Sequence, residues 1–144
     1  MTQVVVRPAA DGDSAALTDL LDQLGYPATP GVMPARLQRL LSNHNAAALV
    51  AVRDGRVIGL ATMHIISPLN RAHDVAWLTT LVVDAANRGT GAGRALVKAV
   101  EAHARMHGCE RLTVTTHEDR SDANAFYQRI GFQLTGRRFG MTLD

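Results

Sequence analysis

The chain has 144 residues and a formal net charge of only +2, and hydrophobic residues make up 47% of it while aromatic residues make up 4%. This length fits one domain of about 100–200 residues, and a charge this small and scattered excludes a nucleic-acid-binding surface. No apolar run approaches the roughly 18 residues of a membrane span, the N-terminus lacks the basic and apolar regions of a signal peptide, and one cysteine makes no internal disulfide. We therefore expect a single domain over residues 1–144, in the cytoplasm, without nucleic-acid or membrane partners.

The N-terminal third predicts a strand followed by two helices. Residues 4–7 alternate weakly between apolar and polar, which favours a first strand. Asp11 or Asp13 is expected to cap a helix that runs to Gly25, and a second helix is expected over residues 34–42, after a loop that contains prolines. Leucines at helical spacing predict the inward faces of the two helices: Leu17, Leu20, Leu21 and Leu24 on the first, and Leu37, Leu40 and Leu41 on the second.

A β-hairpin and a further strand follow. Residues 47–53 and 56–66 are rich in strand-forming side chains and flank Asp54-Gly55. This pair favours a type I′ turn, because both of its residues tolerate positive φ. Residues 75–83 predict the next strand.

The C-terminal half predicts two more helices and three more strands. The expected bounds are a helix from near Gly91 to about His107 with Gly108 as its stop, a strand over 111–116, a helix between Ser121 and Gly131, and a closing hairpin over 132–143. One apolar stripe marks the buried face of the first of these helices: Leu96, Val97, Val100 and Ala104.

A glycine-rich loop, NRGTGAG at residues 87–93, joins the strand over 75–83 to the helix that follows it. Glycines at alternate positions remove Cβ atoms from the turn and let successive N–H groups converge on an anion, beside the positive end of a helix dipole. The fingerprint G-x-G-x-x-G/A is excluded because Arg94 occupies its last position, and a Walker loop is excluded because the chain has no Gly-Lys pair. The remaining form, R-x-x-G-x-G, predicts a phosphate site; the alternative for any single glycine is a plain tight turn.

This loop resembles the pyrophosphate loop of the GNAT superfamily of acetyl-CoA-dependent N-acetyltransferases, and RSDANAFYQRIGF at residues 120–132 resembles the closing motif of that superfamily. The resemblance covers the whole chain. It implies an α/β (α+β) fold in which a twisted mixed β-sheet carries helices on both faces, in the order βααβββαβαββ. It also implies acetyl-CoA as the acetyl donor, a small-molecule primary amine as the acceptor, and direct attack in a ternary complex, and it allows a homodimer.

The resemblance further implies the cofactor site. A backbone N–H near Leu81 or Val82, freed at a bulge where two strands splay apart, would stabilise charge on the thioester oxygen. Tyr127 is expected to protonate the leaving thiolate, because the pKa of a phenol, about 10, exceeds that of a thiol, about 8.5; the alternative role is that of a core aromatic. The expected cofactor contacts are Leu81, Val82, Val83, Arg88, Gly89, Thr90, Gly91, Ala92, Gly93, Arg94, Asn124 and Tyr127.

The general base is where the sequence departs from the superfamily. Many members carry Glu at or near the position of Thr80, and a threonine cannot accept the proton that the amine must lose. His117, which follows the expected strand over 111–116, is the first choice, because a histidine titrates near neutral pH. The other candidates are Asp84, His64, His73, Glu118 and a water relay.

A second departure concerns Arg120, where many members have Asn. The overall layout, including MHII at residues 63–66 and RFGMTL at 138–143, is similar to that of aminoalkylphosphonate N-acetyltransferases. Two roles stay open for Arg120: a bidentate grip on an acidic acceptor, or a salt bridge to Asp122 or Glu118.

Two other classes of function and a metal site are also considered. A protein lysine or N-terminal acetyltransferase and a noncatalytic acyl-CoA-binding domain remain as alternatives to the small-molecule enzyme. His103 and His107 stand at i, i+4 on one expected helix, but no Glu completes an H-E-x-x-H motif, so no metal is expected.

Overall fold

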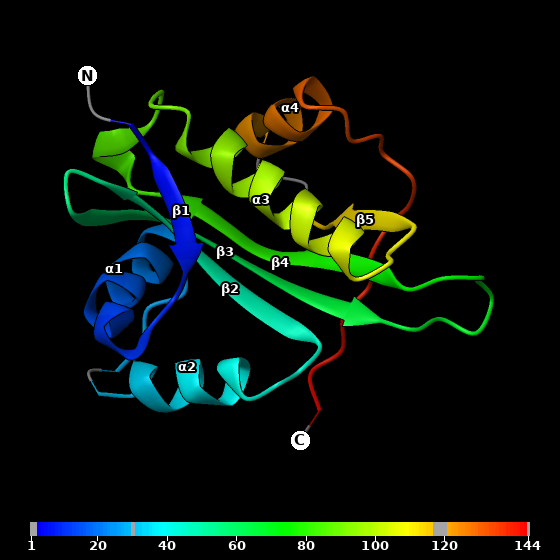
Figure 1. Ribbon diagram of the computed structural model, residues 1–144, viewed down its shortest axis with the longest axis horizontal. Helices are drawn as coiled ribbons and strands as arrows, with labels where there is room; N and C mark the ends of the chain where they lie inside the picture. Colours follow the sequence, from blue (N-terminus) through cyan, green and yellow to red (C-terminus); the bar gives the residue numbers. More distant parts are fainter. Residues whose placement is uncertain (1–2, 30, 117–120, 144) are drawn as a thin grey trace. The chain divides into compact units, whose positions relative to one another are not determined.

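The computed structural model describes residues 3–29, 31–116 and 121–143. The chain divides into two compact units, Met1–Thr113 and Val114–Asp144, which are described separately below (Figure 1).

The first unit is built on a sheet whose strands follow chain order from one edge to the other. The five strands in the described part of the chain are β1 (Val5–Pro8), β2 (Ala46–Arg53), β3 (Arg56–Ile66), β4 (Val75–Val83) and β5 (Arg111–Val114). Neighbours from β1 to β4 pair antiparallel. The predicted hairpin turn is confirmed, because Asp54 and Gly55 have φ values of 54° and 74°.

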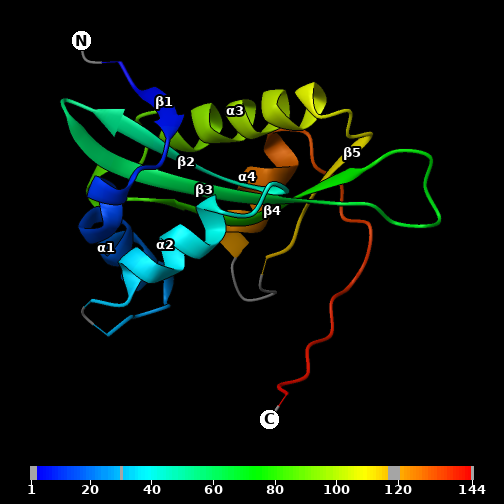
Figure 2. The same ribbon diagram turned by 60° about the horizontal axis from the view of Figure 1, so that its bottom comes forward.

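Helices cover both faces of this sheet. The helices α1 (Ser14–Leu24) and α2 (Met33–Leu41) lie on one face, and α3 (Ala92–Met106) lies on the other (Figures 1 and 2). Gly25 has a φ of 103° and ends α1, and Gly108 has a φ of 75° just beyond α3, as the sequence predicted. The α/β class with helices on both faces is therefore confirmed.

The core on the α1 and α2 side forms between apolar helix faces and the sheet. Leu17 and Leu20 of α1 are buried against it, and Leu37 of α2 is buried with Met33. Leu41 was predicted to point inward, but it is 39% exposed. It is the last residue of α2, and Leu40 takes the position beside the core instead. The stripe predicted on α3 is confirmed, since Leu96, Val97, Val100 and Ala104 are all buried.

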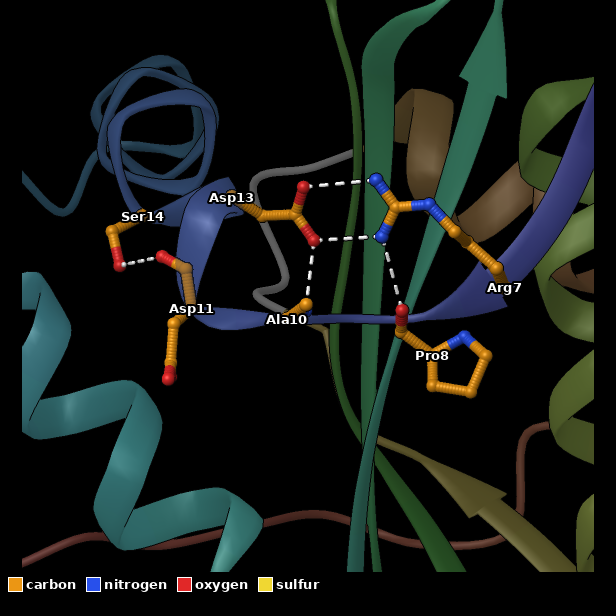
Figure 3. Close-up of polar contacts among 6 residues, drawn as sticks. All are labelled: Arg7, Pro8, Ala10, Asp11, Asp13 and Ser14. Carbon is orange, nitrogen blue, oxygen red and sulfur yellow. Dashed lines mark hydrogen bonds and ion pairs between the residues drawn. The ribbon is translucent and has the colours of Figure 1, made fainter.

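The predicted cap of α1 is confirmed in position only. Asp13 occupies the N-cap position, but its side chain makes no capping hydrogen bond to the helix, and residues 11–13 form a short 3-10 turn before it. The carboxylate of Asp13 instead accepts hydrogen bonds from both terminal nitrogens of Arg7 at 2.8 and 2.9 Å and from the Ala10 N–H at 2.8 Å (Figure 3). The arginine lies on β1, a partner that the local pattern of a helix cap does not reveal. The contact ties the first strand to the first helix.

Removing this contact should lower the stability of the fold in a pH-dependent way. The hydrogen bonds from Arg7 hold the pKa of Asp13 below its ordinary value. The carboxylate therefore stabilises the fold fully above its unfolded pKa of about 3.9, and this stabilisation is lost as pH falls through the folded pKa. We expect Asp13→Ala to lower the free energy of unfolding by about 1–2 kcal/mol at pH 7, measured by urea denaturation.

The difference between wild type and Asp13→Ala should shrink below about pH 4. Asp22→Ala is the matched control, because Asp22 is an exposed carboxylate on α1, the helix that follows Asp13. A difference that persists unchanged in acid would show that the Asp13 carboxylate charge does not stabilise the fold.

The second unit contains α4 (Ser121–Arg129) and the segment after it. Gly131, with a φ of 112°, follows the helix, and the Phe132 N–H donates to the Tyr127 carbonyl at 2.9 Å. The predicted closing hairpin is wrong, because residues 132–143 contain no strand. Strands need partners for their N–H and C=O groups, and Gly136 and Gly140 weaken this run further.

Candidate active site

The glycine-rich loop begins directly after β4. A 3-10 turn, Ala85–Asn87, follows the strand, and the Thr90 hydroxyl donates to the Asn87 carbonyl at 2.7 Å. Gly89 and Gly91 have φ values of 83° and 88°, a region that side chains with Cβ rarely adopt. A Cβ added to either glycine would meet no atom within 4 Å. The two glycines thus face open space above the start of α3.

The residues of this loop fit a pyrophosphate group. Ala92, Gly93 and Arg94 form the first turn of α3, where backbone N–H groups have no acceptor within the helix. Gly91 precedes them without any side chain to cap these groups. Arg88 is exposed beside them and forms no ion pair with a described residue. Unsatisfied donors, a helix dipole and a free guanidinium favour a polyanion at this end of α3.

Asp84 anchors the loop rather than serving as a base. Its carboxylate accepts from Gln23 Nε2 at 2.8 Å and from Asn87 Nδ2 at 2.7 Å. Gln23, on α1, also accepts from the Ala85 N–H at 2.9 Å. The hydrogen bond from Gln23 is the main cause that lowers the pKa of Asp84. A carboxylate with a lowered pKa and both oxygens occupied is a poor proton acceptor, so Asp84 is a weak candidate for the general base.

The irregularity in β4 lies earlier than the resemblance implies. Leu81, Val82 and Val83 pair with β3 without interruption. The register shifts where Thr62 pairs with Thr80 and Met63 with Leu78, which leaves Thr79 as the extra residue. In the pairing of β4 with β3, the bulge is therefore at Thr79 of β4. The oxyanion donor near Leu81 or Val82 stays a prediction. Because a bulge breaks the alternation of faces, Thr79 and Thr80 both face the α1 and α2 side.

These two threonines line a cavity of about 500 Å³. It lies between the sheet and the helices α1 and α2, and apolar side chains of α1, α2, β2 and β3 form much of its wall. Its polar lining comes from Arg36, Arg39, Asn43, Thr62, His64, Thr79 and Thr80. A volume of this size suits a small molecule.

A hydrogen-bonded cluster within this lining orients His64. The Thr79 hydroxyl donates to the Thr62 carbonyl at 3.2 Å, and the two threonine hydroxyls lie 2.8 Å apart. With its own proton used, Thr79 Oγ1 accepts from the Thr62 hydroxyl and from His64 Nδ1, which lies 3.3 Å away. This assignment leaves His64 Nε2 without a proton and able to accept one.

The predicted site residues fall in both units of the chain. Leu81, Val82 and Val83 lead into the loop, and Arg88 to Arg94 form the loop and the start of α3. Tyr127 and Asn124 lie on α4 in the second unit. The Tyr127 ring contacts the rings of Phe126 and Phe132 edge-on, at centroid distances of 5.5 and 5.6 Å. The predictions for His117, Glu118 and Arg120 concern residues outside the described part of the chain.

The remaining histidines do not form a site. His73 donates its backbone N–H to the Glu110 carboxylate at 3.0 Å in the connection before β4, and it does not line the cavity. His103 and His107 stack on α3 with ring centroids 4.3 Å apart, and burial lowers the pKa of His103. Within the described residues, no group of three or more His, Cys, Asp or Glu side chains is arranged to hold a metal ion.

Sequence reasoning named His64 and Thr80 but missed the other polar residues that line the cavity. Arg36 and Arg39 stand at i, i+3 beside Leu37 and Leu40, a spacing that places cations along the edge of a buried face. The Thr79-Thr80 pair interrupts an apolar strand, which is a weak signal of a bulge. Neither signal by itself distinguishes a binding site from a solvated surface.

Comparison with known proteins relates these features to a family. The model of the Acetyltransferase (GNAT) family matches residues 14–132. The chain is 32% identical over 103 residues to the aminoalkylphosphonate N-acetyltransferase of Salmonella typhimurium, which spans 72% of this chain and 67% of that protein. It is 29% identical over 136 residues to the aminoglycoside N(6')-acetyltransferase type 1 of Stenotrophomonas maltophilia, which spans 92% of this chain and 88% of that protein.

A solved structure agrees in fold. An aminoglycoside N-acetyltransferase in complex with CoA has a TM-score of 0.88 to this chain at 21% identity, covering 99% of this chain and 96% of that one. In the described part of this chain, no helix is long and apolar enough to cross a membrane.

Proposed function

The chain belongs to the acetyltransferase (GNAT) family and is an acetyl-CoA-dependent N-acetyltransferase, and we propose that it acetylates the primary amine of a small molecule by direct attack in a ternary complex. The observation that carries the proposal is that β4 both lines the cavity and leads into the glycine-rich loop. Thr79 and Thr80 of β4 line the cavity, and the phosphate loop starts just after Val83. At about 3.3 Å per residue, the four residue steps from Thr79 to Val83 along β4 span roughly 13 Å.

The cavity favours a small acceptor over a protein. About 500 Å³ is within the range of small-molecule sites. The two curated relatives described above are named for small-molecule amines, an aminoalkylphosphonate and an aminoglycoside. Acetylation of a protein lysine or N-terminus is the second candidate, and a noncatalytic acyl-CoA-binding role is the third.

Three groups would assist the transfer. The amine nitrogen forms a bond to the thioester carbon, the C–S bond breaks, and the thiolate takes a proton. A backbone N–H near Leu81 or Val82 would stabilise the negative charge that develops on the carbonyl oxygen. Tyr127 would donate the proton to the thiolate. The amine, with a pKa of about 10.4, is only about 0.04% neutral at pH 7 and must lose a proton before it attacks.

We propose His64 as the group that accepts this proton. Its ring lines the cavity, and the hydrogen bond of Nδ1 to Thr79 leaves Nε2 as the acceptor. His117, the first choice from the sequence, stays a prediction because it lies outside the described residues.

A pH profile distinguishes the two histidines. If His64 is the base, kcat/KM should show a limb that rises with pH before the amine itself ionises, and His64→Gln should remove this limb and lower the rate at pH 7 by about tenfold or more. His117→Ala should then leave the profile intact. The reverse result would assign the role to His117, and a rise toward the pKa of the amine in both variants would indicate a water relay.

A screen of amines tests the function itself. The protein, acetyl-CoA and single amines of different classes are mixed, and thiol release is followed together with mass spectrometry of the products. The proposal expects thiol release that requires a small amine and yields its N-acetyl derivative. Acetylation only of peptides would favour the second candidate, and binding of acetyl-CoA without any turnover would favour the third.

The proposal also treats residues 1–144 as one catalytic domain that works in the cytoplasm, with a homodimer as an allowed assembly. A single cooperative unfolding transition in calorimetry would support one domain, provided that a fluorescent label placed in the second unit reports the same midpoint temperature. Two separated transitions would contradict it.

A further inference from the structure

The charge of the cavity wall selects among amines. Arg36 and Arg39 both line the cavity from α2, where their i, i+3 spacing places them on one side of the helix. None of the described residues that line the cavity is acidic. The helix itself, with the sequence MPARLQRLL, also lacks an acidic residue. The wall therefore has a positive charge that nothing in it neutralises.

These two guanidinium groups have no partner among the described residues. Other arginines do form ion pairs, as Arg7 does with Asp13 at 2.8 Å. No such pair or side-chain hydrogen bond involves Arg36 or Arg39. Two like charges at i, i+3 also repel each other slightly along the helix. Five donors on each guanidinium remain available for an anion.

The sheet side of the cavity has polar side chains but, among the described residues that line it, no arginine and no carboxylate. Thr62, Thr79 and Thr80 present hydroxyls there, and His64 presents an imidazole. These groups can receive a neutral amine and its proton, but no carboxylate is present among them to hold a second cationic group. A polycationic acceptor would therefore meet two arginines and no counter-charge, which is unfavourable at close range.

We propose that the acceptor is a short amine that carries an acidic group, a phosphonate, phosphate or carboxylate, which Arg36 and Arg39 bind while the amine faces His64 and Thr79. Guanidinium groups bind such anions through paired, charge-assisted hydrogen bonds. The inference rests on the proposed function, because the cavity is taken as the acceptor site. It adds that the anion on the acceptor, and not a second amine, determines which molecule is chosen.

A matched series of amines tests this selection. Aminoethylphosphonate and β-alanine carry an anion, propylamine has a methyl group in its place, and diaminopropane carries a second amine. We expect kcat/KM for the anionic amines to exceed that for propylamine by about tenfold to a hundredfold, and diaminopropane to be the poorest substrate. The advantage should decrease as salt is raised, since the guanidinium groups are exposed.

Two variants assign the effect to the arginines. Arg36→Gln with Arg39→Gln should remove the preference for the anionic amines over propylamine, because Gln keeps a polar side chain but removes the charge. Arg105→Gln with Lys98→Gln is the control for net charge, because it also removes two positive charges and both residues are exposed on α3, which lies on the other face of the sheet from α2. It should leave the preference unchanged.

Binding of propylphosphonate, which has no amine, separates this inference from the proposed function. Calorimetry should detect its binding to the wild type and a loss of about tenfold or more in the double variant, even if no amine tested is acetylated. Equal binding to both proteins, or a preference for propylamine or diaminopropane, would overturn the inference and leave the acetyltransferase function intact. Absence of turnover with every amine, combined with arginine-dependent binding, would contradict the proposed function alone.

Discussion

Replacing Tyr127 with phenylalanine is expected to lower kcat by about 10²–10⁴-fold, with little change in the dissociation constant for acetyl-CoA. The substitution keeps the ring that packs edge-on against Phe126 and Phe132 and removes only the hydroxyl. Without this donor the thiolate must leave unprotonated or take its proton from water. Stopped assays of thiol release would give kcat, and calorimetry with acetyl-CoA would give the dissociation constant.

The chain supplies a matched control for this substitution. Tyr26 is the other of the two tyrosines and is 64% exposed, in the loop between α1 and α2. Tyr26→Phe makes the same chemical change and should leave kcat within about twofold. If Tyr127→Phe also stays within about twofold, Tyr127 serves in packing and water protonates the thiolate.

Gly91→Glu is expected to weaken acetyl-CoA binding by more than about 100-fold, equivalent to about 2.7 kcal/mol. The carboxylate would stand at the start of α3, where the free N–H groups of the first helical turn favour the pyrophosphate. Bulk and like charge at that position oppose the ligand. Titration of acetyl-CoA in a calorimeter measures the loss directly.

Backbone strain needs its own control, because Gly91 has a φ of 88° and any residue with a Cβ is strained there. Gly108, at the other end of α3, has a φ of 75°, and a Cβ added to it also meets open space. Gly108→Glu should therefore cost a similar amount of stability, about 1–2 kcal/mol, without changing the affinity for acetyl-CoA. Equal affinity in wild type and Gly91→Glu would remove the phosphate assignment of the loop.

Local sequence patterns were sufficient where neighbours along the chain decide the structure. The turn at Asp54-Gly55 and the helix ends at Gly25 and Gly108 depend on φ values that few residues adopt. The apolar stripe of α3 has a period that only a helix satisfies. Each of these features involves residues within a few positions of one another, so the pattern contains the needed information.

Patterns failed where a distant partner decides. Asp13 stands at the N-cap position of α1, but its carboxylate makes no capping hydrogen bond to that helix and instead accepts from Arg7 on β1. The C-terminal run over 132–143 alternates like a strand, yet it forms no strand and pairs with none among the described residues. A strand pattern therefore predicts a capacity to pair, and the pairing itself depends on the rest of the fold.

The candidate site likewise has one part that depends on neighbours along the chain and one part that depends on distant residues. The glycine-rich loop and the start of α3 could be predicted from sequence because the glycines, the arginine and the helix start are consecutive, and the phosphate role of the loop stays a prediction. The cavity could not, because Arg36, His64 and Thr79 meet only through the packing of α2 on a sheet whose register shifts at one residue. The same shift places two consecutive threonines on one face, which alternation along an ideal strand forbids.

The direct transfer of the acetyl group to an amine is tested most directly by initial velocities measured while acetyl-CoA and one accepted amine are both varied. The account predicts that the thiol is released only when the amine is present, that thiol and N-acetyl product form in equal amounts, and that the reciprocal plots intersect, as they do when both substrates must be bound together. Thiol release without an amine, together with parallel reciprocal plots and an acetylated protein in the mass spectrum, would contradict it and indicate a covalent acetyl-enzyme.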